Sequence, residues 1–132
     1  MALRLLLDTN AYTALLRGHA DVAARVRAAE GIVLSAVVAG ELLFGFRHGS
    51  KHAENARRLD AFLENPYVSF LPVTWTTAER FGQIAAGLRR KGRPLPSNDI
   101  WIAAHALECG ADLLSGDRHF EAIEGLSWIP FS

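Results

Sequence analysis

The sequence holds 132 residues, of which 50% are hydrophobic and 21% are charged. This composition is typical of a globular protein rather than a disordered one, and the length suits one buried core, so we expect a single domain over residues 1–132. Fourteen basic residues balance fourteen acidic ones, so any site for a polyanion has to come from a local cluster of cations. The single cysteine, Cys109, excludes an internal disulfide and a cysteine-based zinc finger.

The chain begins with a short apolar run that Asp8 interrupts, which is too early for a secretory signal peptide. No stretch approaches the roughly 18 apolar residues that span a membrane. A single cysteine also suits a reducing compartment. We therefore expect a soluble, cytoplasmic protein without a membrane partner.

Short apolar runs alternate with helix-forming segments along the whole chain. Periodicity and stop signals predict strands at residues 3–8, 31–35, 67–73, 111–115 and 126–131. They predict helices at residues 9–18, 20–29, 36–49, 51–64, 76–91, 97–110 and 116–123, the first capped by Thr9 or Asn10. This alternation predicts an α/β fold with a parallel sheet of four to five strands and helices on both faces.

Glu41 is the only charged residue in the apolar stretch 32–46. A buried, unpaired carboxylate is costly, so Glu41 has to be paired, protonated or bound to a metal ion. A salt bridge to an arginine is the simple alternative to a functional role.

Three further carboxylates stand at positions where ligands bind in parallel sheets. Asp8 closes the first strand, Asp117 follows the fourth, and Asp99 opens the helix that leads into the fourth. Each one alone is explained as a helix cap or a turn residue. Because ligands of such sheets lie beyond the carboxyl ends of the strands, we expect the three to converge with Glu41 at one edge.

Four ionised carboxylates at one edge favour a bound cation. Each close pair would repel by roughly 4 kcal/mol at an effective dielectric constant of 20. Oxygen ligands indicate Mg²⁺, with Mn²⁺ as the other choice, and the five histidines form no recognised zinc motif. A hard metal without a nucleophilic side chain suggests activated water that attacks a phosphodiester.

A basic segment precedes Asp99. Its cations are Arg89, Arg90, Lys91 and Arg93. Such residues bind phosphates without reading the base sequence. They also suit the negative end of a helix dipole, and this alternative stays open.

Four segments, "LLLDTN", "AGEL", "SNDIWIAAHAL" and "LLSGDRHF", resemble in order and spacing the motifs of PIN-domain nucleases. The short length and the Asp-Thr-Asn start are most similar to VapC toxins of toxin–antitoxin pairs. The resemblance covers nearly the whole chain. It implies a three-layer α/β/α fold, a Mg²⁺- or Mn²⁺-dependent endoribonuclease acting on RNA, a homodimer, and a VapB-like antitoxin that occupies the active-site groove in a hetero-oligomer.

The family's four acidic positions fall on Asp8, Glu41, Asp99 and Asp117. The resemblance implies that Asp8 and Asp99 are the most direct metal ligands. It also implies supporting polar roles for Thr9, Asn10 and Ser115. One departure is Gly116, where many relatives carry asparagine.

Two other functions stay open. A haloacid-dehalogenase-like phosphatase also ends its first strand on an aspartate, but it would want a second aspartate where Asn10 stands. A catalytically silent PIN-like module that only binds RNA is the second alternative, and the four filled acidic positions count against it.

Apolar residues lie on either side of the Glu41 helix and at the start of a later one. Leu42, Phe44, Phe46 and Trp75 form a candidate surface for an amphipathic segment of the antitoxin. We expect most of them to pack in the core instead.

Overall fold

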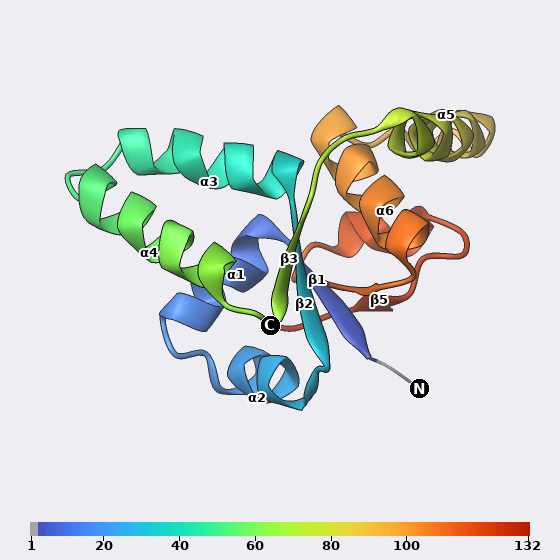
Figure 1. Cartoon of the computed structure of the whole chain (residues 1–132). Coiled ribbons are helices and arrows are strands. Elements are labelled where there is room, and N and C mark those ends of the chain that lie inside the picture. Colours follow the sequence, from blue (N-terminus) through green and yellow to red (C-terminus); the bar gives the residue numbers. More distant parts are fainter. Residues whose placement is uncertain (1–2) are drawn as a thin grey trace.

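The computed structural model describes residues 3–132 and contains a five-stranded sheet in which all four recorded strand pairings are parallel (Figure 1). The strand order is β3-β2-β1-β4-β5, so the first strand of the chain lies in the middle of the sheet. The strands are β1 (Arg4–Leu7), β2 (Gly31–Ser35), β3 (Val68–Leu71), β4 (Asp112–Leu114) and β5 (Trp128–Ile129). The helices are α1 (Thr9–Leu16), α2 (Ala20–Ala28), α3 (Ala36–Arg47), α4 (His52–Glu64), α5 (Trp75–Arg90), α6 (Ser97–Cys109) and the 3-10 helix η1 (Arg118–Ala122). Every predicted strand and helix is present.

Both faces of the sheet are buried. Leu5 and Leu7 of β1 pack with side chains of α1 and α2 on one face. Leu6 points to the other face, where it belongs to a core built mainly from α3, α4, α5 and α6. This alternation explains why the three buried residues of β1, Leu5, Leu6 and Leu7, are all apolar, and it confirms the predicted α/β fold with three layers.

The two edge strands are shorter than predicted. β3 ends at Leu71 before Pro72, and β5 ends at Ile129 before Pro130. Proline has no amide hydrogen, so it cannot continue a ladder of backbone hydrogen bonds. None of the helices within residues 3–132 has the length and apolar content needed to cross a lipid bilayer.

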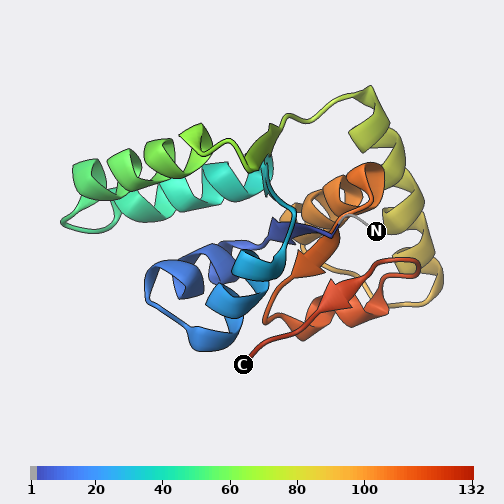
Figure 2. The same cartoon turned by 60° about the horizontal axis from the view of Figure 1, so that its bottom comes forward.

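Helices α3 and α4 lie side by side and extend beyond the sheet in both views (Figures 1 and 2). Leu42 is buried on this pair of helices and Phe46 is partly buried, as expected. The expectation of burial is wrong for Phe44, which is 67% exposed, and for Trp75, which is 79% exposed. Glu41 therefore sits in a helix whose apolar residues are shared between the core and the surface.

Candidate active site

The carboxyl end of β1 carries Asp8, which is 5% exposed. Asp8 is the N-cap of α1, so the prediction that Thr9 or Asn10 caps this helix is wrong. Its Oδ1 accepts a hydrogen bond of 2.7 Å from the Thr9 amide, and its Oδ2 accepts one of 2.6 Å from Ser115 Oγ. Both carboxylate oxygens are thus fixed in direction before any ligand arrives.

Ser115 links two acidic residues that are far apart in the sequence. Its hydroxyl donates to Asp8 and accepts a hydrogen bond of 3.0 Å from the Asp117 amide. Gly116 stands between the two contacts, and a Cβ at this position would lie 3.2 Å from the carbonyl oxygen of Phe131. The loop is therefore packed closely against the C-terminal segment, and Asp117 is placed by Ser115 rather than by a side chain at position 116.

Glu41 reaches the same edge from α3. Its Oε1 accepts a hydrogen bond of 2.8 Å from Thr9 Oγ1, and its Oε2 accepts one from Asn98 Nδ2. Within residues 3–132 the recorded ion pairs do not include Glu41. The salt-bridge alternative is therefore not observed, and two neutral donors orient the carboxylate instead.

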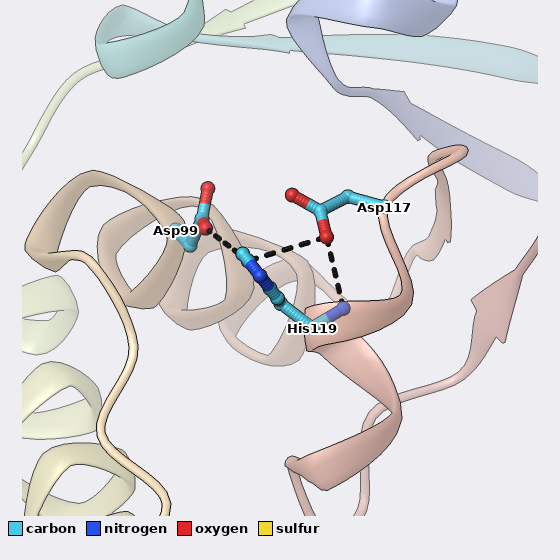
Figure 3. Close-up of side chains that lie close together, drawn as sticks. All are labelled: Asp99, Asp117 and His119. Atoms are coloured by element: carbon cyan, nitrogen blue, oxygen red, sulfur yellow. Dashed lines mark hydrogen bonds and ion pairs between the residues drawn. The ribbon is translucent and has the colours of Figure 1, made fainter.

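Asp99 and Asp117 face each other across the ring of His119 (Figure 3). Asp99 lies in the first turn of α6, and Asp117 is the N-cap of η1. The Nδ1 atom of His119 is 3.4 Å from Asp99 Oδ2 and 3.2 Å from Asp117 Oδ1. The four carboxylates thus come together from four elements, as predicted, and we call Asp8, Glu41, Asp99 and Asp117 the acidic cluster.

The carboxylates of the acidic cluster lie close enough to repel one another. Burial raises the pKa of Asp8, and the charges of Asp99 and Glu41 raise it further against the opposing hydrogen bonds from Ser115 and Thr9. Burial also raises the pKa of Asp99, with added repulsion from Asp117 and Glu41 and partial relief from His119. Concentrated negative charge of this kind is relieved by a divalent cation.

The donor set fits such a cation. Asp99, Asp117 and His119 each offer one ligand atom, and these atoms lie within 4.8 Å of one another. Asp8 and Glu41 lie outside this group of three, but their carboxylates are oriented by hydrogen bonds and are near enough to raise the pKa of Asp99 (Glu41) or to have their own pKa raised by Asp99 (Asp8). Carboxylate oxygens with one imidazole suit Mg²⁺ or Mn²⁺ better than a metal that prefers thiolate ligands.

Sequence reasoning missed two residues of this site. Asn98 had no role assigned, although it directly precedes Asp99 and bonds to Glu41. His119 was set aside because it belongs to no zinc motif, although its amide donates a hydrogen bond of 2.9 Å to Asp117 Oδ1. His119 lies two residues after Asp117, which caps η1. This spacing was the available signal, because an aspartate often accepts a hydrogen bond from the backbone amide two residues later.

The remaining predicted residues lie outside the hydrogen bonds described above. Asn10 is exposed, and its supporting role stays a prediction. Lys91 donates a hydrogen bond of 2.9 Å to the Ala122 carbonyl and pairs with Glu124 at 3.2 Å. Arg89, Arg90 and Arg93 are exposed. Lys91 thus links the end of α5 to the end of η1. Because the three arginines are exposed, they are the better candidates for RNA contacts.

We expect the double variant Arg89→Gln/Arg90→Gln to bind single-stranded RNA with a weaker dependence on salt. Each lost phosphate contact on a single strand lowers the slope of log K against log salt by about 0.7, so two contacts lower it by about 1.4. Binding isotherms at several salt concentrations without divalent ions measure the slope. The matched control is Arg25→Gln/Arg27→Gln, which makes the same charge change on α2, and an equal slope in both variants would contradict the prediction.

Comparison with known proteins gives the family. Residues 5–126 match the model of the PIN domain. The tRNA(fMet)-specific endonuclease VapC of Shigella flexneri is 30% identical over 127 residues, which cover 94% of this chain and 95% of that protein. Ribonuclease VapC1 of Haemophilus influenzae strain R2866 is 27% identical over 128 residues, covering 93% and 94% of the two chains.

Solved structures agree with this result. The structure of VapBC-1 from nontypeable Haemophilus influenzae superimposes with a TM-score of 0.85 at 28% sequence identity and covers 97% of this chain and 98% of that one. The chain belongs to the PIN-domain family, and its full-length similarity to these relatives places it among the VapC-type proteins of that family. The resemblance predicted from its motifs is thereby confirmed.

Proposed function

We propose that this protein is a Mg²⁺- or Mn²⁺-dependent endoribonuclease and the toxin of a VapBC-like toxin–antitoxin pair. The observation that carries the proposal is the acidic cluster, in which four carboxylates from four elements meet at the carboxyl edge of a PIN-type sheet. Two relatives that align over nearly the whole chain are named as a ribonuclease and as a tRNA(fMet)-specific endonuclease, which supports the same chemistry here.

Each residue of the site has a definite task in this proposal. Asp8 and Asp99 hold the metal ion, and Glu41 and Asp117 complete its surroundings. When bound, the ion lowers the pKa of a coordinated water and stabilises negative charge on the phosphodiester. Ser115, Thr9 and Asn98 keep the carboxylate oxygens turned toward the ion, because each donates a hydrogen bond to one of them.

Partners follow from the same comparison. The similar solved structure is that of VapBC-1, and a further fold neighbour from Mycobacterium tuberculosis is named a member of the VapBC family of toxin–antitoxin systems, which supports a VapB-like antitoxin for this chain. Phe44 on α3 and Trp75 at the start of α5 are exposed, so apolar surface is available for an antitoxin segment or for a second copy in a homodimer. We propose a cytoplasmic setting, where RNA and the antitoxin are present, and a single domain over residues 1–132.

The residue at position 10 disfavours the phosphatase alternative. A second aspartate would have to stand at position 10, but Asn10 stands there, and its exposed side chain makes none of the side-chain hydrogen bonds found within residues 3–132. The silent-module alternative requires the acidic cluster to be incomplete, and all four carboxylates are in place.

The test is cleavage of a defined RNA by the purified protein in Mg²⁺ or Mn²⁺. In the proposed mechanism the metal ion would activate the attacking water, so we expect fragments with a 5′-phosphate and a 3′-hydroxyl, and no cleavage after chelation. Analysis of the end groups by labelling and mass spectrometry checks the result. A 2′,3′-cyclic phosphate would contradict the mechanism, since it arises from attack by the RNA's own hydroxyl. Hydrolysis of phosphomonoesters without RNA cleavage would support the phosphatase instead.

A further inference from the structure

His119 stands between two carboxylates of the acidic cluster. It lies in the first turn of η1, two residues after Asp117, and its amide is bonded to Asp117 Oδ1 at 2.9 Å. The ring of His119 lies between the two carboxylates, with Nδ1 near an oxygen of each (Figure 3). The side chain is 54% exposed, so it is directed by these contacts and not by packing in the core.

The distances around Nδ1 match those between ligands of one metal ion. Nδ1 is 3.2 Å from Asp117 Oδ1 and 3.4 Å from Asp99 Oδ2. Neighbouring ligands on an octahedral ion, with bonds of about 2.1 Å, lie about 3 Å apart. We infer that His119 provides a nitrogen ligand to the ion of the acidic cluster, which makes this centre selective for Mn²⁺ over Mg²⁺.

The selectivity follows from the chemistry of the ligand. Mg²⁺ prefers oxygen ligands and keeps much of its water, so an imidazole adds little to its binding. First-row transition metals bind imidazole well, and Mn²⁺ also accepts the carboxylates that surround it here. The inference rests on the proposed function, because it concerns the ion that the acidic cluster would hold.

The experiment uses untagged, full-length protein loaded with Mn²⁺ alone. Pulsed electron paramagnetic resonance detects the modulation that a directly bound ¹⁴N nucleus imposes on the Mn²⁺ echo. We expect this modulation in the wild-type protein and its loss in His119→Ala. The matched control is His48→Ala, because His48 is also exposed and its ring contacts Phe44 near the end of α3, whose carbonyl it hydrogen-bonds, rather than the acidic cluster. This control should keep the signal.

Calorimetric titration with each metal gives a second readout. We expect His119→Ala to weaken Mn²⁺ binding about tenfold or more, the loss typical of disturbed metal sites, and to weaken Mg²⁺ binding much less. Asp99→Asn should weaken the binding of both ions.

The outcomes separate the inference from the proposed function. Bound Mn²⁺ without nitrogen modulation, lost in Asp99→Asn, would overturn the role of His119 and leave the nuclease site intact. His119 would then be only an ion-pair partner of the two carboxylates. Modulation that survives in His119→Ala would assign the nitrogen to another group and also overturn the inference. If the wild-type protein binds neither ion, the metal-dependent function fails and the inference fails with it.

Discussion

We expect Asp99→Asn to lower the rate of RNA cleavage at least about 100-fold while the protein stays folded. The Asp99 side chain is 13% exposed and lies beside Asp117 and His119, so the substitution removes one charge from the centre of the site with little change in shape. A metal ion supplies several kcal/mol of transition-state stabilisation, and each 1.36 kcal/mol corresponds to about tenfold in rate. Single-turnover cleavage of a defined RNA in saturating Mn²⁺ measures the loss.

Two further variants test whether the loss of cleavage is specific to the acidic cluster. Asp8→Asn should give a similar loss, because Asp8 is the other most direct metal ligand in the proposal. Asp60→Asn, at an exposed position of α4, makes the same chemical change away from the acidic cluster and should cleave like the wild-type protein. Normal cleavage by Asp99→Asn and Asp8→Asn would remove the acidic cluster from the mechanism.

Asp99→Asn also tests how much the repulsion between the carboxylates of the acidic cluster lowers the free energy of unfolding. Burial, followed by the charges of Asp117 and Glu41, raises the pKa of Asp99 in the folded protein. Its ionisation at neutral pH therefore opposes folding, and this cost disappears as the pH falls through the raised pKa toward the unfolded value. Without divalent ions we expect Asp99→Asn to be more stable than the wild-type protein at pH 7, by about 1 kcal/mol, as is common when a functional site is relieved of strain.

Thermal melts at several pH values check both the size and the sign of the stability difference between Asp99→Asn and the wild-type protein. The advantage of Asp99→Asn should shrink in acid, where the wild-type carboxyl is protonated as well. Added Mn²⁺ should raise the melting temperature of the wild-type protein, because a ligand that binds only the folded state stabilises it. An advantage that is constant from pH 7 to acid would assign the effect to something other than charge.

Expression of the wild-type chain alone should arrest bacterial growth, and co-expression of its antitoxin should restore it. An arginine of the antitoxin that enters the acidic cluster would compete with the metal ion through paired hydrogen bonds to a carboxylate. Growth curves with equal amounts of soluble toxin measure the effect. Asp8→Asn should be harmless by itself and should still bind the antitoxin, since one lost charge leaves the surrounding surface in place. Normal growth with abundant wild-type protein that cleaves RNA in vitro would contradict the toxin role.

Strands and helices were predictable where one physical signal dominated. Leu5, Leu6 and Leu7 are apolar because β1 is buried on both faces, and this short apolar run predicted the strand. The convergence of the four carboxylates was also predictable, since parallel strands bring their carboxyl ends to one edge of the sheet.

The contacts that complete the site were not predictable, because they depend on how separate elements dock. Asn98 meets Glu41 only because the first turn of α6 lies against α3. His119 was dismissed on its sequence spacing, which says nothing about a carboxylate 20 residues earlier in the chain. Phe44 and Trp75 were expected in the core, since a pattern of apolar residues does not tell which side of a helix will find a neighbour.

The hydrogen bond between Ser115 and Asp8 joins residues 107 positions apart. Asp8 is synthesised before Ser115 and Asp117, and the contact between them forms only when β4 takes its place beside β1. A ribonuclease assembled in this order is inert while the segment between these residues is being made, so the messenger RNA that encodes it is translated past β4 before the product can cut RNA.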